Sequence, residues 1–343
     1  MAMPKCAPKA APAGVSSPDR TPTDLSAGSK AGALNHWRDY WQLLKPRVMA
    51  LVIFTSWVGL YLAPTHLPPI KALIAMLCIA TGAGAAGALN MWWERRSDGL
   101  MKRTRQRPLP AGRLQPTPAL LFAVALAIAS VAVMAFAING LAAGLLALTI
   151  VFYVGIYTIW LKPRTPQNIV IGGAAGALPP VIGWAAATGQ TALLPWLLFL
   201  LIFVWTPPHF WALAINLRQD YAKAGTPMLP VVAGLPHTVR QIWFYSLLCV
   251  AVSLLPPLFG LTGWLYAATA IGLGGWFARS CWRLYQVDTT DEQALAKHAK
   301  ATFACSIVYL FGLFLGLVLD HALLAPLNFP FIPPLTPSSV LPR

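Results

Sequence analysis

The sequence predicts an all-α membrane protein that crosses the bilayer nine times. Of its 343 residues, 57% are hydrophobic and only 10% are charged, and the mean hydropathy is +0.62. Too little polar surface remains to cover a water-facing exterior, which excludes an ordinary soluble domain. Between the charged residues lie long stretches without Asp, Glu, Lys or Arg, and each can hold one or two helices of roughly 20 residues.

The charge-free stretches divide into nine helices. The three longest stretches hold two helices each, because short uncharged segments typical of turns interrupt them at residues 138–141, 187–191 and 260–264. Spanning helices are therefore expected at residues 48–63, 70–92, 117–138, 141–161, 168–188, 192–215, 242–260, 264–284 and 302–324. Residues 1–35 carry almost no large apolar side chains, so we expect a disordered arm ahead of one membrane domain, residues 36–343.

The basic residues predict the orientation of the helices. Of the 25 lysines and arginines, all but Lys71 and Arg343 fall in the amino-terminal arm or in loops on the same side. Such loops stay in the cytoplasm, so the amino terminus is expected to be cytoplasmic and the carboxyl terminus periplasmic. The net charge of +15 thus indicates topology, and no nucleic-acid partner is expected, because no soluble basic domain is present. Asp19, Asp24 and the prolines of the arm favour a bacterial inner membrane over the mitochondrial inner membrane.

Acids, an amide and many bases follow the second predicted helix at one membrane face. Asn90, Glu94 and Asp98 are spaced i, i+4, i+8, which places them on one helical face with roughly 6 Å between rows. Carboxylate and amide oxygens suit Mg²⁺, which completes its shell with water and a substrate phosphate. The alternative is that these acids pair with neighbouring bases in a solvated loop.

A second loop, residues 215–230, repeats this combination of acids and bases after the sixth predicted helix. Two such loops at one face predict a diphosphate site in which carboxylates hold Mg²⁺ and cations neutralise the remaining oxygens. The expected metal ligands and catalytic residues are Asn90, Glu94, Asp98 and Asp220. The expected diphosphate-binding residues are Lys102, Arg103, Arg105, Arg107, Lys162, Arg164 and Lys223.

His209 lies inside a predicted span, directly after two prolines. An ionisable residue at membrane depth indicates function, as an axial ligand to haem iron, a proton-transfer group or part of a substrate pocket. The alternative is a neutral histidine that donates to a carbonyl freed by Pro207 or Pro208. Gly172 and Gly176, at GxxxG spacing in the fifth helix, predict close helix packing, although the same smooth surface could admit a flat macrocycle.

Three segments together resemble the protohaem IX farnesyltransferases, also called haem O synthases. They are NMWWERRSDGLMKRTRQRPLPAG (residues 90–112), LKPRTPQNIVIGGAAGALPPVIGW (residues 161–184) and WTPPHFWALAINLRQDYAKAGTPMLPVV (residues 205–232). The first is typical of the wider intramembrane aromatic prenyltransferase superfamily, and the third is specific to the haem branch. The resemblance extends from about residue 36 through the ninth helix, and it implies nine helices around a central cavity whose cytoplasmic mouth is closed by two acidic loops.

The resemblance also implies an activity. The family transfers the farnesyl group of farnesyl diphosphate to a vinyl group of haem B with Mg²⁺ and adds water, which gives haem O for terminal oxidases. It places Asn90, Glu94 and Asp98 in the first metal-diphosphate motif and Asp220 in the second. Membrane lipid surrounds the protein, and haem A synthase and terminal-oxidase assembly proteins are candidate partners. The family commonly has an acid where Arg96 stands, which leaves the number of Mg²⁺ ions open.

Three other functions are weighed against this interpretation. Prenylation of an aromatic quinone precursor conflicts with the segment that contains His209. A secondary transporter would be expected to carry charges near the midplane, whereas these charges gather at one face. A haem-binding assembly factor without catalytic activity would not need Glu94 and Asp98 beside a cationic loop.

Overall fold

The structure is a computed structural model that describes residues 37–324, all of whose regular structure is helical. The expected amino-terminal arm lies outside the described residues. The elements below belong to one unit that begins at Asp39. Seven helical segments are long and apolar enough to cross a membrane, or eight if the bent pair Trp37–Leu43 and Val48–Tyr61 counts as one span. The all-α membrane architecture is thus confirmed, and nine spans and the orientation of the termini stay predictions.

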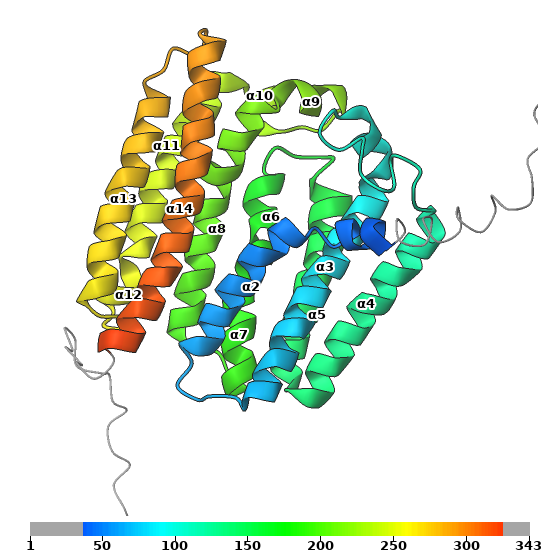
Figure 1. Cartoon of the computed structure of the whole chain (residues 1–343). Coiled ribbons are helices and arrows are strands. Elements are labelled where there is room, and N and C mark those ends of the chain that lie inside the picture. Colours follow the sequence, from blue (N-terminus) through cyan, green and yellow to red (C-terminus); the bar gives the residue numbers. More distant parts are fainter. Residues whose placement is uncertain (1–36, 325–343) are drawn as a thin grey trace, which may run out of the picture. The chain divides into compact units, whose positions relative to one another are not determined.

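Helices occupy each of the nine expected ranges within the described residues (Figure 1). They are α2 (Pro46–Tyr61), α3 (Pro69–Leu100), α4 (Pro116–Ala137), α5 (Gly140–Val151) with η2 (Phe152–Leu161), α6 (Asn168–Ala177) with α7 (Pro179–Thr188), α8 (Leu193–Asn216), α11 (Gly234–Ser253) with α12 (Leu255–Leu258), α13 (Trp264–Tyr285) and α14 (Glu292–Leu324). Two short helices, α9 (Arg218–Lys223) and α10 (Leu229–Val232), follow α8.

Three helices extend further than the apolar pattern predicts. Helix α3 continues past residue 92 to Leu100, α11 begins at Gly234 instead of residue 242, and α14 begins at Glu292 instead of residue 302. Charged residues mark the end of an apolar span. The helix itself can continue beyond that point, because many polar and charged residues are also good helix formers. The added turns of all three helices are at the end of the unit where α9 and α10 lie (Figure 1).

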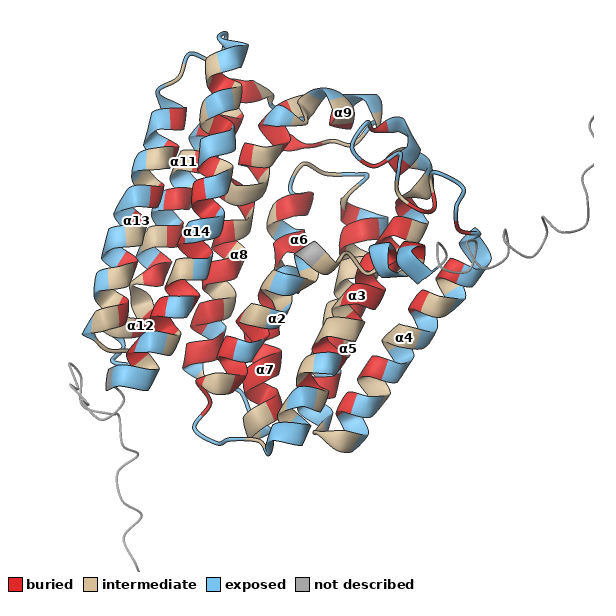
Figure 2. Ribbon diagram, in the orientation of Figure 1, coloured by how far each residue is buried: buried red, intermediate tan, exposed pale blue. Residues whose placement is uncertain are grey.

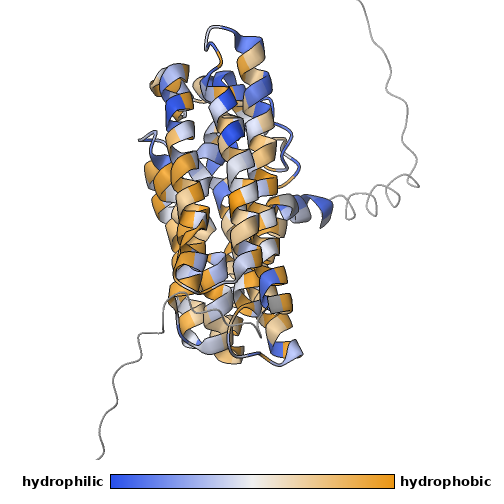
Figure 3. Cartoon of the chain, turned by 90° about the vertical axis from the view of Figure 1, so that its left-hand side faces the viewer, coloured by the Kyte–Doolittle hydropathy of each residue, from blue (hydrophilic) through white to orange (hydrophobic). Residues whose placement is uncertain are grey.

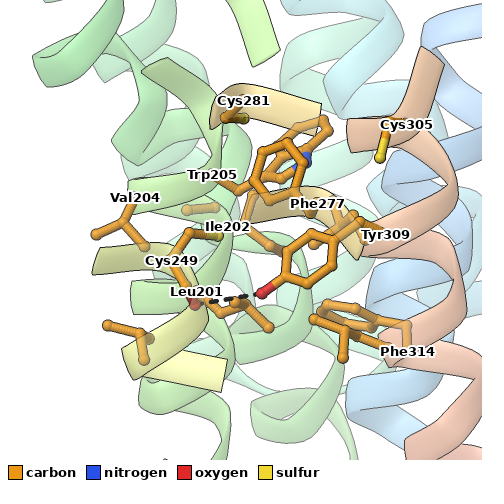
Figure 4. Packing of buried hydrophobic residues seen from close by; sticks show 14 of the residues in the cluster. Leu201, Ile202, Val204, Trp205, Cys249, Phe277, Cys281, Cys305, Tyr309 and Phe314 are labelled. Atoms are coloured by element: carbon orange, nitrogen blue, oxygen red, sulfur yellow. Dashed lines mark hydrogen bonds between the residues drawn. The ribbon is translucent and has the colours of Figure 1, made fainter. Parts of the chain in front are cut away.

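Helix α8 packs against α6, α7, α11 and α14, while α3 packs against α4 and α2 against α7. Figure 2 shows buried residues along α6, α7 and α8 and exposed outer faces on α4 and α13. The largest apolar cluster joins α8, α11, α13 and α14, where the rings of Phe277 and Tyr309 stack with centroids 4.8 Å apart. The Tyr309 hydroxyl donates to the Cys249 carbonyl oxygen over 3.2 Å (Figure 4), which satisfies a buried polar group inside this cluster.

Glycines allow α2 and α7 to meet backbone against backbone. A Cβ on Gly183 would lie 2.0 Å from the Ser56 carbonyl oxygen, and one on Gly59 would lie 2.1 Å from the Pro180 carbonyl oxygen. In α6, a Cβ on Gly172 would lie 2.1 Å from the Tyr157 ring, whereas Gly176 has nothing within 4 Å. The expected packing role is therefore confirmed for Gly172, and it is wrong for Gly176 within the described residues.

Two polar side chains close the turns between helices. Asn139 accepts a hydrogen bond from the Ala142 backbone N–H over 2.8 Å and donates to the Ala185 carbonyl over 2.9 Å, so it caps α5 and ties this turn to α7. Asp320 of α14 accepts from the backbone N–H groups of Gly263 and Tyr266 over 2.6 and 3.1 Å. A carboxylate from a distant helix thus supplies the amino-terminal cap of α13.

Gly183→Ala is expected to lower the free energy of unfolding by about 1–3 kcal/mol, because the added methyl group forces α2 and α7 apart. Gly176→Ala is the matched control, since open space surrounds that position. Thermal unfolding in detergent, followed by tryptophan fluorescence, measures both variants. Equal midpoints for the two alanine variants would contradict the α2–α7 contact.

Candidate active site

Helix α3 carries the first acidic motif on its buried face. Because α3 continues to Leu100, Asn90, Glu94 and Asp98 lie one above another on successive turns. Their side chains are buried, with relative exposures of 3%, 9% and 1%. The predicted common face is confirmed, and the alternative of a solvated acidic loop is wrong for these residues.

Each buried carboxylate has a cationic partner from another segment. Lys162, at the end of η2, forms an ion pair with Glu94. Arg107, in the loop after α3, lies with Nη1 2.7 Å from Asp98 Oδ2. A buried carboxylate without a partner would be costly, so these contacts fix both the helix end and the loop.

Lys45 is a part of the site that the sequence interpretation missed. Its Nζ donates to Asn90 Oδ1 over 2.7 Å, and Asn90 Nδ2 donates to Thr158 Oγ1 over 3.1 Å. Burial, with Arg107 as the second cause, lowers the pKa of Lys45, which lies in the turn ahead of α2, to about 7. No charge or spacing in the sequence connects residue 45 with residue 90, so only the fold reveals this pair.

The π-helical turns of η2 place Thr158 and Lys162 beside α3. Thr158 Oγ1 donates to the Tyr153 carbonyl five residues earlier over 2.8 Å, and the Lys162 backbone N–H donates to the Tyr157 carbonyl over 2.9 Å. Such turns are rare and occur frequently at functional sites. Here the wider turn accompanies the placement of Thr158 on Asn90 and Lys162 on Glu94.

The loop that carries Arg107 is held at both of its ends. Thr104 Oγ1 donates to the Asp98 carbonyl oxygen over 2.7 Å at its start. At its end, Arg113 Nε lies 2.8 Å from Asp39 Oδ1, and Asp39 is buried. The position of the Arg107 guanidinium therefore depends on contacts with α3 and with the chain ahead of α2.

The second acidic loop packs against the end of α3. Met101, Ile169, Ala214, Tyr221 and Met228 form one buried apolar cluster that joins α3, α6, α8 and α9. Burial raises the pKa of Tyr221, and the charges that act on this group include those of Arg103, Lys162, Glu94 and Arg107. Tyr221 follows directly after Asp220, so the two loops meet at one end of the helices, as the sequence predicts.

The other predicted site residues lie further out. Asp220 is half-buried in the first turn of α9. Arg164 is exposed and donates to the carbonyl oxygens of Ile159 and Trp160 over 3.2 and 3.0 Å, so it caps the end of η2. Four predicted diphosphate-binding side chains are exposed: Lys102, Arg103, Arg105 and Lys223.

Within the described residues, no three His, Cys, Asp or Glu side chains form a group that could hold a metal ion. Mg²⁺ does not require such a group, because it is commonly bound through one or two carboxylates together with substrate phosphates and water. Glu94 and Asp98 supply two carboxylates of this kind on one face. The donor chemistry therefore fits Mg²⁺ that is completed by a diphosphate.

His209 lies on α8 against α14. Its Nδ1 is 2.7 Å from Ser306 Oγ, and its ring stacks between Trp205 and Phe303 with centroids 4.2 and 4.6 Å away. Ser306 Oγ donates to the Phe303 carbonyl oxygen over 2.6 Å, so the His209 tautomer that satisfies both contacts carries its proton on Nδ1 and donates to Ser306. The partner of His209 is therefore a hydroxyl, and not a carbonyl freed by Pro207 or Pro208 as the alternative interpretation predicted.

Asn168 is a second residue that the sequence interpretation missed. It is fully buried at the first turn of α6, and its Nδ2 donates to the Thr165 carbonyl. Its Oδ1 has no hydrogen-bond partner within the part of the chain that is described. The next residue, Ile169, packs against Met101 and Tyr221, which places this unsatisfied oxygen at the polar end of the helices.

Together these features define an all-helical membrane protein with buried carboxylates and cations paired at one end of its helices. The UbiA prenyltransferase family model matches residues 51–307, and the chain belongs to that family. It is 50% identical over 315 residues to a protoheme IX farnesyltransferase of Caulobacter sp. (strain K31), a match that covers 85% of this chain and 91% of that protein. It is 53% identical over 309 residues to the protein of the same name of Acidiphilium cryptum (strain JF-5), covering 89% and 95%.

Solved structures share the fold at low sequence identity. A digeranylgeranylglyceryl phosphate synthase structure matches with a TM-score of 0.68 and 17% identity, covering 82% of this chain and 98% of that one. A UbiA homolog from Archaeoglobus fulgidus bound to DMAPP and Mg²⁺ matches with a TM-score of 0.54 and 14% identity, covering 80% and 99%. These likenesses establish the fold of the helical unit.

Arg107→Gln is expected to lower the free energy of unfolding by about 1–3 kcal/mol, because Asp98 would remain buried without its cation. Arg105→Gln removes the same charge from an exposed position of the same loop and is the control. Thermal unfolding in detergent at pH 7 without divalent ions measures the difference. Identical midpoints for the two variants would show that the Arg107–Asp98 pair contributes nothing to stability.

Proposed function

We propose that this chain transfers the farnesyl group of farnesyl diphosphate to a vinyl group of haem B with addition of water, giving haem O and diphosphate. The observation that carries this proposal is the pair of buried carboxylates on α3, Glu94 and Asp98, each within reach of a cation from another segment. Relatives named protoheme IX farnesyltransferase, at 50% and 53% identity over most of the chain, support the choice of substrates. Haem O then serves terminal oxidases directly or as the precursor of haem A.

The acidic residues would hold Mg²⁺ at the diphosphate. Glu94 and Asp98 are the proposed carboxylate ligands, and Asn90 and Asp220 complete the set from the turn before and from the second loop. A UbiA homolog from Archaeoglobus fulgidus binds Mg²⁺ together with DMAPP, which supports this assignment. When bound, Mg²⁺ supplies positive charge to the diphosphate oxygens and makes diphosphate a better leaving group.

The basic residues neutralise the rest of the diphosphate charge. Lys162 and Arg107 contact the carboxylates in this structure, and they are proposed to contact the diphosphate oxygens when substrate binds. Arg164, Lys102, Arg103, Arg105 and Lys223 lie around the same end of the helices and are proposed to bind the outer oxygens. Cations at the position where negative charge develops stabilise the departing group in the transition state.

The reaction forms one carbon–carbon and one carbon–oxygen bond, and it breaks the C1–oxygen bond of farnesyl diphosphate, the π bond of the vinyl group and one O–H bond of water. The bond between C1 of the farnesyl chain and the diphosphate oxygen breaks, and its electron pair leaves with diphosphate. A vinyl group of haem B supplies the electron pair for a new carbon–carbon bond to C1. Water adds to the remaining cationic carbon and loses a proton, which leaves a hydroxyethylfarnesyl group. A dry cavity between the helices would protect the allylic cation from earlier attack by water.

His209 is the proposed axial ligand of the haem iron. Because its Nδ1–H donates to Ser306, the lone pair of Nε2 is free to bind a metal. A hydrogen bond on the other ring nitrogen orients a ligating histidine and raises its basicity. The flanking rings of Trp205 and Phe303 hold the imidazole between them.

The cellular setting is part of the same proposal. The chain would lie in the bacterial inner membrane with nine spans around a central cavity, its amino terminus in the cytoplasm and its carboxyl terminus in the periplasm. In that orientation the polar end of the helices faces the cytoplasm. Haem A synthase and oxidase assembly proteins are the proposed protein partners.

Asp98→Ala is expected to reduce haem O formation at least about 100-fold, because it removes a metal ligand and the partner of Arg107. Membranes that contain the protein receive haem B, farnesyl diphosphate and Mg²⁺, and extracted haems are analysed by chromatography and mass spectrometry. Asp288→Ala removes an exposed acid of the loop before α14 and should leave the yield unchanged. A wild-type protein that binds haem but never modifies it would favour an assembly factor.

His209→Ala is expected to shift the Soret band of the bound haem and to weaken haem binding, because the proposed axial ligand is lost. His237→Ala, at the first turn of α11, is the control and should keep the wild-type spectrum. Titration of haem B into the purified full-length protein, followed by absorbance, measures both. If the two variants gave the wild-type spectrum, His209 would not be the iron ligand.

A further inference from the structure

A second polar site lies between α13 and α14, away from the acidic motifs. It is a cavity of about 240 Å³ lined by Trp276, Arg279, Ser280, Arg283, Lys297 and His298, among others. No acid lines it. Two arginines, one lysine and one histidine thus line a single cavity, an arrangement that membrane topology alone does not require.

The acids nearest in sequence are engaged elsewhere. Asp288 accepts from the Thr290 backbone N–H over 2.9 Å, and Asp291 accepts from the Ala294 N–H over 2.9 Å. Glu292 pairs with Arg218 over 3.1 Å. Within the described residues, no ion pair involves Arg279, Arg283 or Lys297, so the cavity keeps its positive charge and is suited to an anion.

Helices α13 and α14 are in contact beside the cavity. Ser280 Oγ and Thr302 Oγ1 lie 3.2 Å apart, and the two helices pack along their lengths. The cavity is below the roughly 300–1,000 Å³ of pockets that enclose a drug-sized ligand. An occupant would therefore place a compact anionic group inside and leave the rest of the molecule outside.

The surroundings of the cavity resemble a membrane interface. Trp276 lines the cavity and Trp282 lies nearby on α13, and both are exposed, as aromatic residues commonly are at the level of lipid headgroups. Ile271, Val308 and Phe311 are exposed further along the same two helices. Figure 3, which views this side, shows hydrophilic residues at the upper end of the helices and hydrophobic residues below them.

We infer that this cavity binds the phosphate-ester headgroup of an anionic phospholipid, whose acyl chains lie along the apolar faces of α13 and α14. Basic pockets between transmembrane helices bind such headgroups, and each Lys or Arg near the surface contributes to the attraction. The site is separate from the diphosphate site, because none of its lining residues lies on α3, η2 or α9. It stands whether or not the proposed reaction is correct.

Binding of phosphatidylglycerol to the full-length protein in detergent, counted by native mass spectrometry, tests this inference. Arg279→Gln with Arg283→Gln is expected to weaken phosphatidylglycerol binding on the order of 10- to 30-fold relative to wild type. Arg240→Gln with Lys300→Gln removes two exposed charges that do not line the cavity, and it should bind as the wild type does. Circular dichroism and the unfolding midpoint verify that both double variants are folded.

Two further binding measurements identify the class of ligand. Phosphatidylcholine should bind much more weakly than phosphatidylglycerol, because its headgroup has no net charge. Glycerol phosphate should not displace the lipid at equal concentration; if it did, the anion site would stand and its ligand would be a soluble phosphate ester. Equal phosphatidylglycerol binding by the wild type and both double variants, or equal binding of the two lipids, would overturn the inference.

Discussion

The burial of two carboxylates on α3 is the constraint on which the polar end of this protein depends. Glu94 and Asp98 are nearly inaccessible, and an ionised group in such a place is costly unless a cation and hydrogen bonds compensate it. Lys162 arrives from the end of η2, and Arg107 arrives from the loop after α3. Ion pairs with these two carboxylates thus connect α3 to the end of η2 and to the loop after α3.

The apolar packing between α2 and α7 helps to position Lys45, the third cation of the site. Gly59 and Gly183 let α2 and α7 approach until a side chain would collide with backbone. This contact fixes α2, and the turn ahead of α2 carries Lys45 to Asn90. The same helix therefore packs against α7 through glycines and begins directly after Lys45, the residue that contacts Asn90.

Much of this arrangement could be predicted from local patterns, and the rest could not. Charge-free stretches located the helices, and the i, i+4, i+8 spacing placed Asn90, Glu94 and Asp98 on one face, because both depend only on neighbouring residues. The contact between Lys45 and Asn90 depends on how α2 and α3 pack, which no spacing encodes. No residue pattern predicts the π-helical turns of η2, and the extra turns of α11 and α14 contain charges that an apolar pattern excludes.

Arg96 illustrates how helix geometry limits the effect of a substitution. It stands two residues after Glu94, and two residues turn an α-helix by roughly 200°, so positions 94 and 96 point to opposite sides. The structure agrees, since Glu94 is buried and Arg96 is exposed. An acid at position 96 would lie away from the face that carries Asn90, Glu94 and Asp98. The arginine at this position therefore leaves the buried donor set intact, and the proposed Mg²⁺ site does not depend on an acid at position 96.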